Sequence, residues 1–455
     1  MRQKQGGKGK TATKLAKMWK KVTKSAEYPH FEQKCGRTRA ENRTDTVNVN
    51  NNNKKIEYMR KLALCMAVAA CTIMVAAPQG ANAQKRMRDY GIVTGVMKPG
   101  KWNAITDVPG VKVGHVTINN GEGGDKKTGV TAIVQHDGNI FRKKVPAAIY
   151  AGNGFGKLSG VTQVKELGNI ETPIILTNTL NVAEGIAGLV EYTLAQPGNE
   201  NVRSVNAVVG ETNDSGLNNI RARYVTKEDV KQAIANAKSG PVEEGAVGAG
   251  TGTVAFGIKG GIGTASRVLP KAYGGYTVGV LVQSNYGGVL EIDGVQVGQL
   301  MRHYNFRDKI LQDVDGSCMM VVITDAPVDA RNLERMAKRA MLGLAKTGGI
   351  ASNGSGDYVI AMSVCPENLI DESTKDLHPT LLHNDDMSPL FLATIEATAE
   401  ALWNSIFVAE PVTGYNGYHV DALDNEQAAK WILDAKKAVG LDKIYKENAK
   451  ANNKK

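Results

Sequence analysis

The sequence predicts an α/β (α+β) fold in which sheets pack together and helices flank them. Strand-like and helix-like segments follow one another in mixed order, and many strand-like segments are neighbours along the chain. No repeat period stands out. This order favours a sandwich of sheets with flanking helices over a doubly wound parallel sheet, which needs strands and helices in strict alternation.

Short apolar runs bounded by turn residues indicate the strands, and apolar side chains at helical spacing indicate the helices. The expected strands cover residues 131–134, 147–150, 172–177, 205–209, 276–282, 318–324 and 358–363. The expected helices cover residues 181–195, 226–237, 329–347, 388–407 and 426–439. Thr226 should cap its helix, with Asp229 three residues further on. Residues 308–315 are polar and should form an exposed loop before Gly316.

The net charge of +11 belongs to the N-terminal part of the chain. Residues 1–61 carry a net charge of +12, residues 62–83 carry none, and the remainder carries −1. A basic binding face on the body of the protein therefore has no support, and we expect no nucleic-acid partner.

The N-terminal part divides into two segments. Residues 1–58 form a low-complexity basic extension rich in Lys and Asn, which we expect to be disordered; Met59 offers an alternative start that would leave it untranslated. Residues 59–83 have the basic start, apolar centre and Ala-x-Ala exit of a secretory signal peptide. Cleavage after Ala83 would give an exported chain, periplasmic or extracellular, without a stable membrane span. A less favoured alternative is a lipid anchor at Cys71.

No motif in the body of the chain indicates a metal or an organic cofactor. Cys318 and Cys365 each lie in an apolar context, which predicts buried free thiols, and no Cys/His cluster has metal-ligand spacing. The Gly-rich loop at residues 152–157 departs from a phosphate-binding loop, with Ala151 in place of Gly and Leu158 in place of Ser or Thr.

The dipeptide Gly316-Ser317, placed between a polar loop and an apolar strand, can support self-cleavage. Gly316 has no Cβ, so the Ser317 hydroxyl can approach the Gly316 carbonyl. Attack would give an ester, and water would then release Ser317 with a free α-amine. The unperturbed pKa of such an amine is about 7.7–8.0, which suits a base for its own hydroxyl at neutral pH.

Several ordered motifs make the chain resemble a known family. They are Trp102–His115, Leu176–Val182, Lys259–Arg267, and Asp315–Ser317 followed by Thr324–Pro327. Together they resemble the self-processing L-aminopeptidase/D-esterase family of N-terminal-serine aminopeptidases, which includes the β-peptidyl aminopeptidases. The resemblance runs from about residue 90 to about residue 420.

The resemblance implies a processed, layered and oligomeric protein. The chain should be cut between Gly316 and Ser317 into an α chain of residues 84–316 and a β chain of residues 317–455. The fold should be a four-layer α-β-β-α sandwich similar to that of ornithine acetyltransferase. Family members assemble as homo-oligomers of αβ units.

The resemblance also implies the catalytic residues. Ser317 is the nucleophile, and Asn285, after the strand 276–282, helps to form the oxyanion hole. Ser355, just before the strand 358–363, should hold the Ser317 hydroxyl or amine, and Asp357 should orient Ser355. Some family members have Glu where this chain has Asp357.

Two residues after the strand 205–209 are implied in substrate binding. Glu211 should pair with the free amino group of the substrate, which explains removal of residues from the amino end. Asn213 stands where some aminopeptidases have Tyr, so the substrate profile of this chain stays open.

The expected function is an N-terminal-serine aminopeptidase that acts on small peptides, amino-acid amides or esters through an acyl-enzyme, without metal or cofactor. One alternative is an acyltransferase or amidohydrolase on the same scaffold. Another is a non-catalytic surface or binding protein, which the presence of Ser317, Ser355 and Asn285 disfavours.

Overall fold

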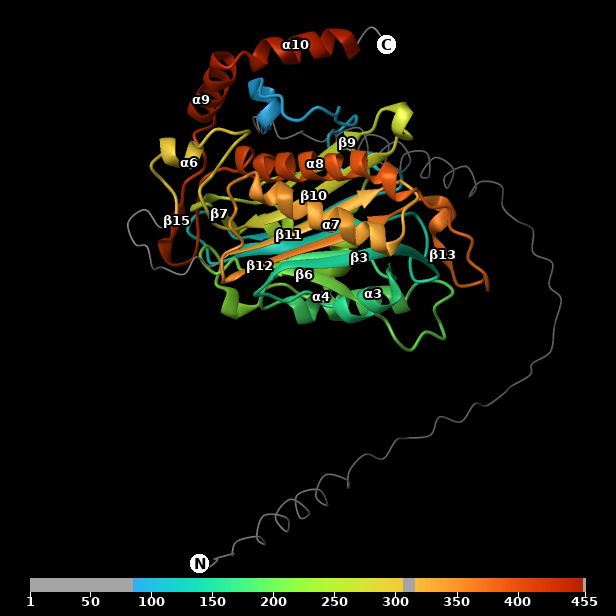
Figure 1. Cartoon of the computed structure of the whole chain (residues 1–455). Coiled ribbons are helices and arrows are strands. Elements are labelled where there is room, and N and C mark those ends of the chain that lie inside the picture. The colour runs from blue at the N-terminus through green and yellow to red at the C-terminus, as the bar shows by residue number, and fades with distance from the viewer. Residues whose placement is uncertain (1–84, 306–315, 453–455) are drawn as a thin grey trace, which may run out of the picture. The chain divides into compact units, whose positions relative to one another are not determined.

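The computed structural model describes residues 85–305 and 316–452 (Figure 1). The described residues all belong to one compact unit, Ala81–Lys455. The predictions for residues 1–58, for the signal peptide at 59–83 and for the loop at 308–315 lie outside the described residues.

The first sheet has four strands in the order β1-β2-β5-β6. Only its last pair, β5 with β6, is parallel. The strands are β1 (Lys112–Asn119), β2 (Lys127–Val134), β5 (Ile174–Asn178) and β6 (Val208–Thr212).

The second sheet has seven strands in the order β13-β3-β12-β11-β10-β9, with β4 pairing to β3. Its central pair, β11 with β12, is parallel, and the neighbouring pairs are antiparallel. The strands are β3 (Lys143–Gly154), β4 (Asn169–Ile170), β9 (Ile262–Val268), β10 (Thr277–Asn285), β11 (Gly316–Thr324), β12 (Ser355–Ser363) and β13 (Ile370–Asp371).

The two sheets pack face to face through one apolar cluster, which joins Ile133 and Leu176 of the first sheet to Leu281, Met319 and Val321 of the second. Side chains alternate between the faces of a strand. The residues that alternate with Leu281, Met319 and Val321 on β10 and β11 therefore point to the face of the second sheet that is turned away from the first, where a second apolar cluster lies.

Helices cover the outer face of each sheet. Helices α4 (Val182–Leu194) and α5 (Lys227–Ala235) pack on the first sheet through a third apolar cluster. Helices α7 (Ala330–Ala345) and α8 (Ser388–Phe407) pack on the second sheet and against each other (Figure 1). The other helices and short hairpins are α3 (Val161–Leu167), α6 (Val297–Leu300), α9 (Asn425–Ala438), α10 (Leu441–Asn452), β7 (Val254–Ala255) with β8 (Ile258–Lys259), and β14 (Val412–Thr413) with β15 (His419–Val420).

The predicted mixture of sheets and helices is confirmed, and so is the Thr226–Asp229 capping box at the start of α5. Cys318 and Cys365 are free and buried, as predicted. Among the described helices, none combines the length and apolar character that a membrane crossing requires.

Several predicted strand boundaries differ from the observed ones, and the differences in β10, β12 and β6 concern site residues. Strand β10 runs to Asn285, so Asn285 lies within it and not after it. Strand β12 begins at Ser355, so Ser355 and Asp357 lie within it and not before it. Strand β6 extends to Thr212, so Glu211 lies in a strand and not in the following turn. In β12 and β6 polar residues continue the strand because neighbouring strands supply hydrogen-bonded partners on the backbone.

Candidate active site

Four residues lie side by side in a row across the ends of four neighbouring strands of the second sheet. Asn285 of β10 pairs with Ser317 of β11, Ser317 pairs with Gly356 of β12, and Gly356 pairs with Gly154 of β3. Residues 285 and 356, which are far apart in the sequence, are thereby brought next to the predicted nucleophile at 317. This row of residues lies at the end of the sheet where strands β10 and β3 finish and strands β11 and β12 start.

Ser317 is 4% exposed, and its hydroxyl lies against the peptide that it is predicted to attack. The Ser317 Oγ donates to the Gly316 carbonyl oxygen at 2.5 Å and accepts from the Gly356 N–H at 3.3 Å. A Cβ on Gly316 would lie 3.0 Å from Tyr286 Cα and 3.2 Å from the Asn285 carbonyl oxygen. A side chain at position 316 would therefore crowd the backbone at Asn285 and Tyr286.

Asn285 is held with its amide nitrogen available. Its side chain is 7% exposed, and its Oδ1 accepts from the Val254 N–H at 2.9 Å. That hydrogen bond fixes which end of the amide is oxygen. Within residues 85–305 and 316–452, no side chain or backbone oxygen accepts from Asn285 Nδ2, so this donor is free for charge that develops beside Ser317.

Ser355 and Asp357 form a pair on the opposite face of β12 from Gly356. The Ser355 Oγ donates to Asp357 Oδ1 at 2.9 Å, whereas no hydrogen bond joins Ser355 to Ser317 in the described chain. Burial raises the pKa of the Asp357 carboxyl to about 6, against the lowering effect of the Ser355 hydroxyl. The predicted Ser355–Asp357 contact is thus present, and in the intact chain the neighbour of the nucleophile is the Gly356 N–H.

Glu211 is a buried carboxylate, 3% exposed, at the end of β6 in the first sheet. Its Oε1 accepts from the Lys157 N–H at 2.9 Å, and its Oε2 accepts from the Thr179 hydroxyl. Burial raises the pKa of the Glu211 carboxyl, although both hydrogen bonds oppose that shift. A Cβ on Gly156 would lie 3.2 Å from Glu211 Oε1 and 3.3 Å from Gly356 Cα, so a single glycine separates Glu211 from the row of active-site residues.

A cavity of about 330 Å³ opens beside the row. Asn285 lines it together with Asn213, whose exposed side chain accepts from the Ser215 N–H at 3.0 Å. Among the described residues that line this cavity, none has a side chain that carries a charge at neutral pH, and Glu211 is not one of them. The two predicted substrate-binding residues therefore lie in different places. Asn213 lines the cavity, whereas Glu211 is buried and does not line it.

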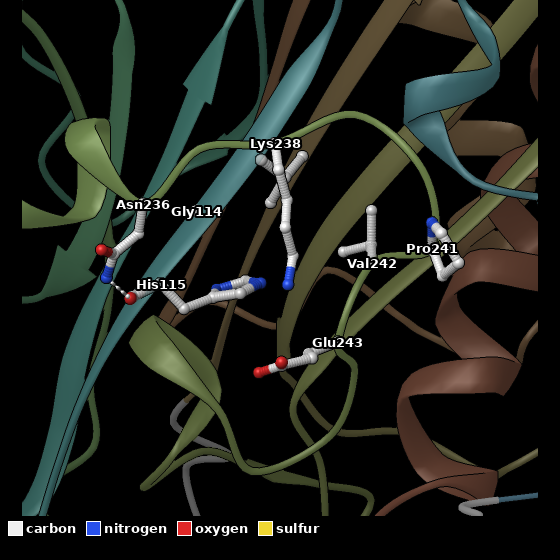
Figure 2. Close-up of a pocket in the computed structure, with 8 residues that line it drawn as sticks. Gly114, His115, Asn236, Lys238, Pro241, Val242 and Glu243 are labelled. Atoms are coloured by element: carbon white, nitrogen blue, oxygen red, sulfur yellow. Dashed lines mark hydrogen bonds between the residues drawn. The ribbon is translucent and has the colours of Figure 1, made fainter. Parts of the chain in front are cut away.

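A second cavity of about 330 Å³ lies away from the predicted residues, beside His115 and Lys238 (Figure 2). Burial and the nearby Lys238 lower the pKa of the His115 imidazole to about 4, so it is neutral at pH 7. Among the described residues that line this cavity there is no Ser, Thr or Cys, so they offer no hydroxyl or thiol nucleophile. Among the described residues, no group of three or more His, Cys, Asp or Glu is placed to bind a metal ion.

Comparison with known proteins identifies the family. The model of peptidase family S58 matches residues 103–420, which include every predicted site residue. The chain belongs to peptidase family S58. The resemblance stated from the sequence motifs is confirmed.

This S58 chain has similar relatives with assigned activities. It is 38% identical over 363 residues to the β-peptidyl aminopeptidase BapA of Sphingosinicella microcystinivorans, covering 75% of this chain and 90% of the relative. The structure matches a Burkholderia sp. β-aminopeptidase with a TM-score of 0.70 at 37% identity, over 78% of this chain and 99% of that one. It also matches the L-aminopeptidase D-Ala-esterase/amidase of Ochrobactrum anthropi, described as a variant of the Ntn-hydrolase fold, with a TM-score of 0.69 at 34% identity, over 77% and 98% of the two chains.

Sequence reasoning missed several residues near the candidate site. Asn153 Nδ2 donates to the carbonyl oxygens of Ser352 and Asn353 and so holds the loop before Ser355. Tyr418, 51% exposed, forms part of the cavity wall, and Lys259, which pairs with Val254 across the β7–β8 hairpin, is fully buried. Lys259 carried a signal in the sequence, a lone cation within a Gly-rich segment, whereas Asn153 and Tyr418 carried none.

Proposed function

We propose that this S58 chain is an aminopeptidase whose nucleophile is Ser317, released as an N-terminal residue when the Gly316–Ser317 bond breaks. The aminopeptidase function is supported by the family and by the activities named for its relatives. The observation that carries the choice of Ser317 is its hydroxyl, 2.5 Å from the Gly316 carbonyl oxygen and next to Asn285.

In the first reaction the Ser317 Oγ attacks the Gly316 carbonyl carbon. The C–N bond breaks and an ester joins Gly316 to the Ser317 oxygen, while the nitrogen takes up the hydroxyl proton. Water then hydrolyses the ester, which leaves a carboxylate on Gly316 and a free α-amine and hydroxyl on Ser317. The products are an α chain of residues 84–316 and a β chain of residues 317–455.

In the second reaction the new α-amine serves as the base. It accepts the proton of the Ser317 hydroxyl as the oxygen attacks the first carbonyl carbon of the substrate, and it returns the proton to the leaving amine. Asn285 Nδ2 donates to the oxyanion. Water then hydrolyses the acyl-enzyme and regenerates Ser317. The Ser355–Asp357 pair offers a hydroxyl and a carboxylate that orient the amine once cleavage has freed it.

Glu211 recognises the substrate's free amino group. A carboxylate favours the cationic amine, so it selects substrates with an unblocked amino end. The substrate class is small peptides, amino-acid amides or esters. Glu211 accepts two hydrogen bonds already and retains lone pairs for a third partner. Asn213 lines the neighbouring cavity, whose described lining is uncharged and which would take an uncharged part of the substrate.

Further features are part of the same proposal. The two sheets with their helices are arranged as a four-layer α-β-β-α sandwich similar to ornithine acetyltransferase, and αβ units associate into a homo-oligomer. The chain is exported after removal of residues 59–83, without a nucleic-acid partner. An acyltransferase on this scaffold would pass the acyl group to an amine in place of water, and a product assay with an added amine separates the two.

The experiment that tests the proposal is mass spectrometry of the purified protein with a parallel activity assay. Wild-type protein should contain a fragment that begins Ser-Cys-Met-Met and should hydrolyse an amino-acid amide. Ser317→Ala should stay uncut and inactive. Ser363→Ala, which changes a buried serine at the other end of β12, should be cut and active. Active wild-type protein with an intact Gly316–Ser317 bond would refute the mechanism.

A further inference from the structure

Lys259, on β8 of the Gly-rich hairpin β7–β8, is a fully buried cation with an unusual set of partners. Its Nζ donates to the carbonyl oxygens of Gly250, Thr253 and Gly260 at 3.0, 2.9 and 2.8 Å. An ammonium group has three N–H donors, so these three acceptors satisfy it completely. Within the described parts of the chain, Lys259 forms no salt bridge. Burial lowers the pKa of the Lys259 ammonium to about 7, and the nearby Asp214 carboxylate opposes that shift.

One peptide group connects Lys259 to the oxyanion residue. The carbonyl oxygen of the Thr253–Val254 peptide accepts from Lys259 Nζ, and the N–H of the same peptide donates to Asn285 Oδ1 at 2.9 Å. The six atoms of a peptide unit lie in one plane, with the oxygen and the hydrogen on opposite sides. Fixing the carbonyl therefore fixes the direction in which the Val254 N–H points.

We propose that Lys259 is a positioning residue for the reaction, acting on Asn285 through the Thr253–Val254 peptide. It holds the peptide plane so that Asn285 must present its oxygen to Val254 and its Nδ2 toward Ser317. Lys259, the Thr253–Val254 peptide and the Asn285 amide also polarise one another in the same direction. When the carbonyl of a peptide binds a cation, the N–H of that peptide becomes a stronger donor. The strengthened N–H in turn makes the Asn285 amide a better donor to the oxyanion.

The alternative is that Lys259 only stabilises the hairpin. Lys259 does join three backbone carbonyls, and its own N–H donates to the Asp421 carbonyl oxygen at 2.8 Å. A purely structural role would lower thermal stability whatever residue stands at 285. A positioning role disappears when Asn285 is absent, because no amide then remains to be oriented.

The test is a double-mutant cycle of Lys259→Met and Asn285→Ala, and it rests on the proposed function. Turnover is measured with an amino-acid ester and normalised to the amount of free N-terminal Ser317 found by mass spectrometry. Lys259→Met should lower kcat by roughly tenfold or more, while its KM stays within about threefold of the wild-type value. Its effect on kcat should be smaller than that of Asn285→Ala, because loss of one oxyanion donor lowers kcat by roughly 100- to 1000-fold. In the Asn285→Ala background, Lys259→Met should change kcat by less than about twofold.

Lys436→Met is the matched control. Lys436 on α9 is also buried, with Nζ donating to the Val93 carbonyl oxygen at 2.6 Å, so its loss should reduce the melting temperature and leave kcat unchanged. Equal losses of kcat from Lys259→Met with and without Asn285, or wild-type kcat in Lys259→Met, would overturn the proposal. If Lys259→Met does not accumulate, Lys259→Gln, which keeps a neutral donor, is judged by the same cycle. Ser317→Ala with wild-type activity would refute the proposed function itself, independently of Lys259.

Discussion

Asn285 and Ser317 are direct partners in the antiparallel ladder of β10 and β11, the last residue of one strand opposite the second residue of the other. Cross-strand partners on one face have Cβ atoms about 4.5–5.5 Å apart. The proposed hydroxyl nucleophile and the proposed amide donor are therefore held together by the backbone of two central strands. Such a site is more rigid than one built on loops.

This register predicts the effect of removing the Asn285 amide. Asn285→Ala should lower kcat by roughly 100- to 1000-fold with little change in KM, because the donor acts on charge that exists only in the transition state. Self-cleavage should slow as well, since it forms a similar oxyanion. Steady-state kinetics and the time course of β-chain appearance measure the two effects. Asn368→Ala, which changes a buried asparagine after the other end of β12, is the control and should retain wild-type rates.

Glu211 should discriminate between substrates with and without a free amine. A hydrogen bond between charged groups contributes about 1.5–3 kcal/mol, so Glu211→Gln should lower kcat/KM for an amino-acid ester by roughly 10- to 100-fold. The deamino analogue of that ester should be affected little. The measured quantity is the ratio of kcat/KM for the two esters. An unchanged ratio in Glu211→Gln would mean that another group binds the amine.

The sequence predicted which segments form strands and helices better than it predicted where some strands end and which residues pair between strands. The strand from residue 318 was found as a continuous apolar run, because β11 is buried on both faces, and the helix at 329–347 was found from side-chain spacing, because burial on one face leaves a periodic pattern. The extension of β12 to Ser355 and of β6 to Glu211 was missed, because polar residues there are buried through hydrogen bonds that only tertiary pairing supplies. The pairing of residues 285 and 317 likewise depends on register between strands, which no local pattern encodes.

Asp357 predicts the acid limb of the pH profile. Burial raises the pKa of its carboxyl to about 6, so the ionised form that orients Ser355 is lost as the pH falls through 6. Protonation of the Ser317 α-amine, whose unperturbed pKa is about 7.7–8.0, should already lower kcat as the pH falls, and loss of the Asp357 charge should add a second, steeper decrease below about pH 6. Asp357→Asn should have a lower kcat and lack this second decrease, whereas Asp357→Glu, which keeps a carboxylate, should retain it. An identical second decrease in wild type and Asp357→Asn would assign that ionisation to another group.

Gly316 predicts a variant that is impaired in processing but keeps the nucleophile. A Cβ at this position would lie 3.0 Å from Tyr286 Cα, closer than most real contacts, so Gly316→Ala should displace the attacked carbonyl from Ser317 Oγ. Self-cleavage should slow by roughly tenfold or more, because a small misplacement of reacting atoms has a large effect on rate. Gly154→Ala, in the same row of the sheet with open space around its Cβ, should be processed at the wild-type rate. The half-time of β-chain release on a denaturing gel measures both.

Glu400 on α8 predicts how the fold responds to acid. Burial alone would raise the pKa of its carboxyl, but Arg267 and Arg88 lower it to about 2. Arg267 donates to Glu400 at 2.7 Å, and both side chains are fully buried. A carboxyl whose pKa is lower in the folded than in the unfolded state stabilises the fold above its unfolded pKa of about 4.3, and this contribution disappears as the pH falls toward 2.

Glu400→Gln leaves Arg267 short of a partner, so it should destabilise the protein by about 3–5 kcal/mol at pH 7. The difference in melting temperature between wild type and Glu400→Gln should then shrink between pH 4.3 and pH 2, roughly the two pKa values. Glu372→Gln, which breaks a half-exposed pair with Arg142, should show only a small difference at any pH. A difference in melting temperature between wild type and Glu400→Gln that stays constant down to pH 2 would show that the carboxylate charge does not stabilise this part of the core.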